Sequence, residues 1–123
     1  MLFYDRLSLS TVTAHNLYWV IKLLIDMTYH RDLALRYAEK WAFGRNPKYY
    51  NFDNLGGDCT NFVSQCLYAG SGVMNYTPTF GWYYISLQKR TPSWTGVTYF
   101  YDFLISNKGA GPWASEVSRE RCV

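Results

Sequence analysis

Two adjacent glycines and an acidic residue, Gly56-Gly57-Asp58, stand directly before the most regular helical pattern of the chain. Adjacent glycines permit backbone turns that other residues avoid, and aspartate is favoured at the N-cap of a helix. After Cys59, apolar residues recur at helical spacing until two glycines interrupt the pattern: Phe62, Val63, Cys66 and Leu67, then Gly70 and Gly72. This junction predicts an irregular turn leading into a helix, with Asp58 as N-cap and Cys66 as a buried, structural residue.

The size and composition predict a single folded domain. A chain of 123 residues with 49% hydrophobic and 20% aromatic residues has enough apolar surface to offset the entropy of ordering. The net charge is only +3, and the basic residues are scattered rather than clustered. A nucleic acid is therefore not an expected partner.

Three cysteines, Cys59, Cys66 and Cys122, cannot all pair within one chain. Their spacing also lacks the C-x-x-C pattern of metal and redox sites, so no metal or other cofactor is predicted. A single reactive thiol remains the interesting option, and its position before the helical pattern favours Cys59.

Residues 1–28 differ from the rest of the chain and form a predicted N-terminal extension. Five apolar residues recur there at helical spacing, namely Leu17, Val20, Ile21, Leu24 and Ile25. They predict an amphipathic helix, which is too short and too charged to cross a membrane. The N-terminus also lacks the features of a signal peptide.

Further helices are predicted on both sides of the central one. The spacing of apolar residues predicts a helix from Arg31 to about Phe43, ended by Gly44 and Asn46-Pro47, and another over residues 97–105. The sequence Thr91-Pro92-Ser93-Trp94 predicts a turn or a helix start.

A cysteine in the first turn of a helix lies at the positive end of the helix dipole, which favours the thiolate over the thiol. The free backbone N–H groups at the same place, around Asp58 and Cys59, can donate to the oxyanion that forms when a thiolate attacks an amide carbonyl. The competing interpretation is that Cys59 is a small buried hydrophobic residue, which is the commoner role of a free cysteine. Asn61 and Gln65 lie on the polar face, where solvent exposure and a place in a cleft remain equally open.

The run from Arg31 to Glu116 resembles the putative amidase domain family of Gram-positive bacteria, which belongs with the papain-like cysteine amidases and peptidases. The matching pieces are Tyr37-Ala38, Asn46-Pro47, Tyr50-Asn51-Phe52, the continuous run from Gly56 to Cys66, Gly81-Trp82, Ser93-Trp94 and Gly111-Pro112.

The resemblance implies an α+β papain-like fold, of which this chain supplies mostly the helical N-terminal half in residues 29–123, with the sheet part truncated. It implies Cys59 as nucleophile, supported by Gly56, Gly57, Thr60, Asn61 and Gln65, and an amide substrate such as a peptide of cell-wall peptidoglycan. Trp82 and Trp94 are interpreted either as aromatic residues beside the substrate or as core residues. The resemblance also implies that the protein acts at the cell wall or outside the cell.

The main departure from the family concerns the general base, which in cysteine hydrolases is usually a histidine. The family histidine follows the cysteine, whereas His15 and His30 both precede Cys59. We therefore expect weak or no amide hydrolysis by this chain. The alternatives are a non-catalytic cell-wall binding module and a degenerate interaction domain that associates with itself through exposed apolar surface.

Overall fold

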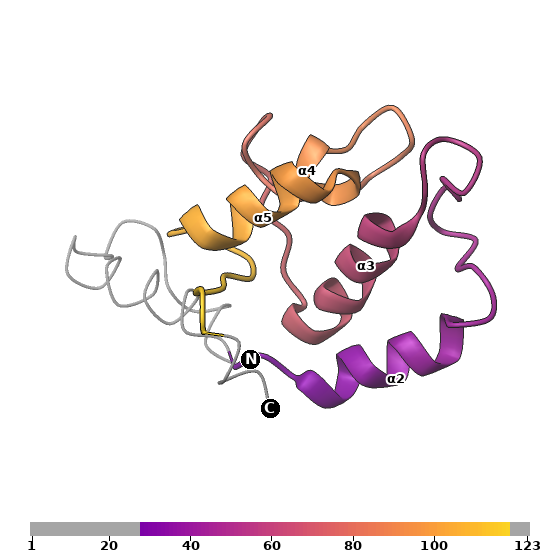
Figure 1. The fold of residues 1–123 in the computed structure, drawn as a ribbon, viewed down its shortest axis with the longest axis horizontal. Coiled ribbons are helices and arrows are strands. Elements are labelled where there is room, and N and C mark those ends of the chain that lie inside the picture. Colours follow the sequence, from indigo (N-terminus) through magenta and orange to yellow (C-terminus); the bar gives the residue numbers. More distant parts are fainter. Residues whose placement is uncertain (1–27, 119–123) are drawn as a thin grey trace, which may run out of the picture.

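Helix α3 (Cys59–Ser71) lies at the centre of residues 28–118, the part of the chain that the structure, a computed structural model, describes (Figure 1). Helix α2 (Arg31–Trp41) packs along one side of α3, and the short helix α4 (Pro92–Thr95) packs against another. Helix α5 (Val97–Ser106) contacts α4. The chain thus wraps helices around α3, the element that begins with Cys59.

The helices begin and end close to where the sequence predicts. Helix α2 ends at Trp41, two residues before the predicted end, and α5 spans Val97–Ser106. Pro92 opens α4, since its fixed φ angle suits the first turn of a helix. Helix α3 passes through Gly70 and ends at Ser71. The next residue, Gly72, has a φ of 66° and caps the helix, with its N–H donating to the carbonyl of Tyr68 at 2.8 Å.

The segment between α3 and α4 folds back on itself through two isolated antiparallel bridges, Asn75 with Trp82 and Tyr84 with Arg90. The backbones of Asn75 and Trp82 exchange hydrogen bonds of 2.9 and 2.7 Å. At Gly81 a Cβ atom would lie 2.3 Å from the carbonyl oxygen of Asn75, so only glycine fits this close approach. The described residues are thus mainly helical, and the relation to a papain-like α+β fold stays a prediction.

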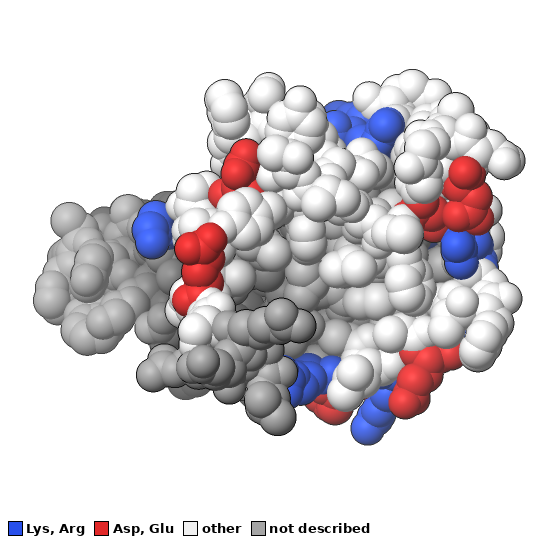
Figure 2. Space-filling model, in the orientation of Figure 1, with Lys and Arg blue, Asp and Glu red and all other residues white. Residues whose placement is uncertain are grey.

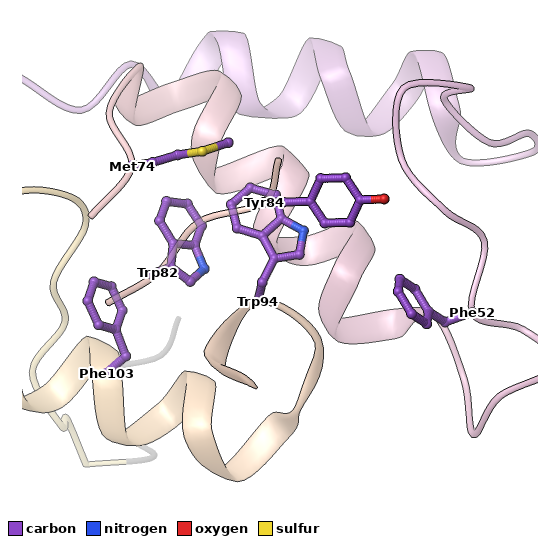
Figure 3. Packing of buried hydrophobic residues seen from close by; sticks show 6 residues of the cluster. All are labelled: Phe52, Met74, Trp82, Tyr84, Trp94 and Phe103. Carbon is purple, nitrogen blue, oxygen red and sulfur yellow. The ribbon is translucent and has the colours of Figure 1, made fainter. Parts of the chain in front are cut away.

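The core consists mostly of aromatic side chains, which Figure 3 shows beside α3. Trp82 and Trp94 are fully buried, with ring centroids 4.7 Å apart, and Phe103 of α5 stacks on Trp82 at 6.0 Å. The buried members of this core are Phe52, Met74, Trp82, Tyr84, Trp94 and Phe103. Residues from the loop before α3, from the segment between α3 and α4, and from α4 and α5 therefore meet on one side of α3.

Helix α3 turns polar residues toward the interior beside Leu67 and Tyr68, so the prediction that its apolar face lies inward is confirmed only in part. Asn61, Ser64 and Gln65 are buried, whereas Val63 is 44% exposed and Phe62 and Cys66 are half-buried. The reason is that a buried indole N–H needs an acceptor. Ser64 Oγ accepts from Trp82 Nε1 at 3.1 Å, and Asn61 Oδ1 accepts from Trp94 Nε1 at 2.9 Å.

On the face shown in Figure 2, charged side chains are scattered between wide uncharged areas. Apolar residues with large exposed fractions include Phe43, Leu55, Phe80 and Val97. The amphipathic helix predicted for the N-terminal extension lies outside the described residues. Within the described part of the chain, no helix has the combined length and apolar character that crossing a bilayer requires.

Candidate active site at the start of helix α3

Cys59 is solvent-exposed and is the first residue of α3. The loop before it closes on Phe52, whose carbonyl accepts hydrogen bonds from the N–H groups of Leu55 (2.8 Å) and Gly57 (3.2 Å). Gly56 and Gly57 have φ angles of 97° and 112°, in the region that favours glycine. The two glycines therefore make the turn that places Cys59 at the helix start, as the sequence predicts.

Asp58 occupies the N-cap position, but its side chain caps no N–H of the helix, which corrects the predicted capping role. The carboxylate is 2% exposed and points into the loop. Its Oδ1 accepts hydrogen bonds from the backbone N–H of Phe52 at 3.0 Å and from the amide of Asn61 at 2.8 Å. Asp58 thus closes the loop from residue 52 to residue 58, and this competing set of donors draws it away from the helix.

Arg45 supplies the charge that balances this buried carboxylate. Its Nε lies 2.9 Å from Oδ2 of Asp58, as an ion pair, while Oδ2 accepts no hydrogen bond within the described residues. The same guanidinium contacts Asp53 at 3.3 Å and donates to the carbonyl of Gly44 at 2.8 Å. The sequence alone does not point to Arg45, because the 12 positions between it and Asp58 carry no periodic signal that links them.

The backbone N–H groups at the start of α3 remain uncapped by Asp58. The first intrahelical bond runs from Phe62 N–H to the carbonyl of Asp58 at 2.9 Å, so the N–H groups of residues 59–61 precede the helical ladder. They lie at the positive end of the helix dipole, beside the thiol of Cys59. The site therefore combines an exposed sulfur atom with donors suited to a developing negative charge.

Asn61 and Gln65, which the sequence left open between solvent and a cleft, are both buried. Asn61 also donates to the carbonyl of Tyr50 at 3.0 Å. Gln65 accepts from the hydroxyl of Tyr37 at 2.7 Å, and that hydroxyl in turn accepts from the amide of Asn46 at 2.9 Å. These contacts fasten α3 to the loop before it and to α2, so both residues support the position of the site from within.

Thr60 is buried beside the site, whereas Cys66 lies along the same side of α3 as Cys59 and Val63. Cys66 is half-buried rather than fully buried, and burial raises the pKa of its thiol. The structural role predicted for Cys66 is consistent with this setting, because a raised pKa leaves less thiolate to react.

Trp82 and Trp94 contribute to the core rather than to a surface that a substrate reaches, since both have 0% exposure. Of the two interpretations given by the sequence, the structure supports the core. Their indole N–H groups donate to Ser64 and Asn61, so both tryptophans contact the helix that carries Cys59.

His30 lies at the end of α3 opposite Cys59, because its backbone N–H donates to the carbonyl of Gly70 at 2.9 Å. A helix rises about 1.5 Å per residue, which puts the two ends of α3 more than about 15 Å apart. His30 cannot reach the thiol of Cys59 across this distance. His15 lies outside the described residues.

Within residues 28–118, no group of three or more histidine, cysteine, aspartate or glutamate side chains is arranged to hold a metal ion. At the start of α3, the groups that could take part in chemistry are the thiol of Cys59, the helix N–H groups and the Asp58–Arg45 pair.

A family model described as "Putative amidase domain" matches residues 28–122, and the chain belongs to this family. Among curated proteins, it is similar to the "Uncharacterized protein YhbB" of Bacillus subtilis (strain 168), with 41% identity over 85 residues. That match covers 68% of this chain and 26% of the relative, so the chain spans about a quarter of the relative's length. No solved structure matches the chain significantly.

Proposed function

We propose that this chain carries the nucleophile and oxyanion-binding part of a cysteine-dependent amide hydrolase, with Cys59 as the nucleophile. Membership of an amidase family supports amide chemistry. The observation that carries the proposal is the exposed thiol of Cys59 at a helix start whose N–H groups are left uncapped by Asp58. A helix N-terminus favours the thiolate, the reactive form of cysteine.

In the proposed reaction, the thiolate of Cys59 attacks the carbonyl carbon of an amide, and an S–C bond forms as the C=O electron pair moves to oxygen. The backbone N–H of Cys59 donates to this oxyanion. The C–N bond then breaks, the amine leaves with a proton, and water hydrolyses the resulting thioester.

Protonation of the leaving amine is the step that this chain supports least. A histidine usually supplies it, no histidine follows Cys59, and His30 lies at the other end of α3. We therefore expect Cys59 to react readily with esters that have good leaving groups, which leave without a proton. Turnover of amides by this chain alone is expected to be slow.

We extend the proposal to peptide bonds of cell-wall peptidoglycan, with action at the cell wall or outside the cell. This extension rests on the resemblance to a family of Gram-positive bacteria. The papain-like arrangement, in which a sheet carries the histidine, belongs to the same extension and applies to the whole protein rather than to the described residues.

The direct test is to trap an acyl group on Cys59. The protein is incubated with p-nitrophenyl acetate, the burst of p-nitrophenolate is followed by absorbance, and the acetylated residue is located by mass spectrometry. We expect one acetyl group on Cys59, which persists because no histidine of residues 28–118 lies near this thiol. Cys59→Ala should abolish the burst and Cys66→Ala should leave it unchanged. Acetylation confined to lysines, or an unchanged burst in Cys59→Ala, would refute the proposal.

A second candidate function, binding to the cell wall without catalysis, is favoured by a different surface. Trp113 is 67% exposed and lines an open hollow of about 520 Å³ together with Asn107, Lys108 and Glu116. An exposed aromatic ring beside polar groups suits the binding of a sugar or a peptide. This surface is separate from the buried tryptophans that the sequence highlighted.

Sedimentation with purified peptidoglycan distinguishes this candidate from catalysis. A binding module would co-sediment equally well as wild type and as Cys59→Ala, and it would lose binding on Trp113→Ala. No co-sedimentation, or equal retention of the Trp113 variant, would exclude the hollow as the binding surface.

A further inference from the structure

The negative charge of Asp58 lies immediately before the proposed nucleophile. A carboxylate beside a thiol opposes formation of the thiolate, and Asp58 would come nearest to Cys59 if it turned to cap the N–H groups of α3. Aspartate is among the preferred N-cap residues, and to cap these N–H groups Asp58 would have to leave its present φ of −107° and ψ of 1° for the extended backbone usual at an N-cap. In the structure the carboxylate instead points into the loop, toward Phe52 and Asn61.

Two hydrogen bonds hold Oδ1 of Asp58, but Oδ2 has only the ion pair with Arg45 at 2.9 Å. If a neutral residue replaced Arg45, the buried Oδ2 of Asp58 would be left without any partner in the described part of the chain. Such an oxygen is costly to bury, and rotation toward the uncapped N–H groups of residues 59–61 would relieve the cost. Arg45 therefore decides which of two sets of donors the Asp58 carboxylate uses.

We infer that Arg45 is a positioning residue for Cys59, because its ion pair keeps the Asp58 carboxylate in the loop and away from the N–H groups at the start of α3. The inference rests on the proposed function, in which those N–H groups serve the thiolate and the oxyanion. Arg45 itself is 39% exposed at its side chain and donates to the carbonyl of Gly44, while its solvent-exposed ion pair with Asp53 contributes little to holding it in place. It acts through Asp58 and touches no reacting atom.

A positioning role and a purely structural role of Arg45 predict different results when Arg45→Met and Asp58→Asn are combined. If Arg45 merely stabilised the loop, Arg45→Met and Asp58→Asn would each loosen the site, and the double variant would be no better than either. If Arg45 controls the Asp58 charge, removing that charge in the double variant removes the reason why Arg45 is needed.

The experiment measures the rate of Cys59 alkylation by iodoacetamide near neutral pH in chains that also carry Cys66→Ala and Cys122→Ala. We expect Arg45→Met and Arg45→Gln to slow alkylation roughly three- to tenfold, because the carboxylate then faces the thiol in a partly solvated site. Arg45→Lys, which keeps the charge, should restore most of the rate. Asp53→Asn is the matched control, since it removes the other ion pair of Arg45 and should leave the rate within twofold of the parent.

The decisive comparison is between Arg45→Met and Arg45→Met/Asp58→Asn, which should recover at least half of the lost rate. A double variant as slow as Arg45→Met would overturn the inference, as would an Arg45→Met rate equal to that of the parent. Loss of cooperative thermal unfolding in both neutral Arg45 variants would make the ion pair purely structural and would overturn it too. The ratio of variant to parent rates tests the role of Arg45. The parent rate alone tests the proposed function, which fails if parent Cys59 reacts no faster than a small-molecule thiol.

Discussion

The indole N–H of Trp94 donates to the side-chain carbonyl of Asn61 at 2.9 Å, in a part of the core where both residues are fully or almost fully buried. The same Asn61 amide reaches Asp58 and the carbonyl of Tyr50. One side chain on α3 therefore connects the aromatic core with the loop that precedes Cys59. The position of the proposed nucleophile depends on polar contacts inside the core.

Replacement of Asn61 by alanine tests this connection. The substitution would leave the buried Trp94 N–H without an acceptor, and the Asp58 carboxylate would lose one of its hydrogen-bond donors. We therefore expect a loss of about 2–3 kcal/mol in the free energy of unfolding. Urea denaturation followed by tryptophan fluorescence measures the loss. Asn54→Ala, at an exposed position in the same loop, is the matched control and should change stability by less than about 0.5 kcal/mol. Equal effects of the two substitutions would contradict the buried role of Asn61.

Gly57→Ala tests the turn before Cys59. A Cβ at this position would meet no atom within 4 Å, so any cost comes from its φ of 112° alone. We expect a loss of about 1 kcal/mol or more and slower alkylation of Cys59, because the loop would relax toward a negative φ. Gly44→Ala is the control, since its Cβ would make only ordinary contact with Trp41 and no unusual φ is required. A Gly57→Ala protein as stable and as reactive as Gly44→Ala would argue against the turn.

Ionisation of Tyr49 is expected to lower the free energy of unfolding at high pH. Burial, followed by the neighbouring phenol groups, raises its pKa from 10.0 to about 12, and its ring stacks on Trp94 at 5.9 Å. Since the pKa is higher in the folded state, the stabilisation is complete below about pH 10 and is lost as the pH rises through about 12. Because the ring is only partly buried, the full shift is discounted to roughly 1 kcal/mol.

The measurement compares wild type with Tyr49→Phe, which cannot ionise, in urea denaturation between about pH 9 and pH 12. The wild type should lose roughly 1 kcal/mol more than the variant over this range. Parallel pH profiles for the two proteins would show that Tyr49 does not contribute in this way.

The sequence predicts the helices well because their signals are local. The glycines at positions 56, 57 and 72, the Asn46-Pro47 pair and Pro92 act within a few residues of the ends that they set. The inward face of α3 differs in part from the prediction, for a physical reason: Leu67 packs against the core as expected, but polar residues lie beside it. Periodicity assigns the apolar side to the core, but the core opposite α3 presents indole N–H groups, and these require the polar residues Asn61 and Ser64.

The candidate site was predictable at Cys59 and much less so around it. The glycines and the helix start are contiguous in sequence, whereas Arg45 and Tyr37 reach the site through tertiary contacts from α2 and the loop after it. The sequence predicts the commonest local role for Asp58, the N-cap, but donors from Phe52 in the preceding loop and from the Asn61 side chain override that preference. The papain-like fold and the role of Cys59 in catalysis stay predictions.

The most direct test of the central claim is the alkylation rate of Cys59 compared with that of Cys66. Cys66→Ala/Cys122→Ala isolates the first thiol, and Cys59→Ala/Cys122→Ala isolates the second. Near neutral pH, we predict that iodoacetamide labels Cys59 at least about tenfold faster than Cys66, whose pKa is raised by burial, and faster than a small-molecule thiol. A Cys59 that reacts no faster than the small-molecule thiol would contradict the claim that the start of α3 holds an activated nucleophile.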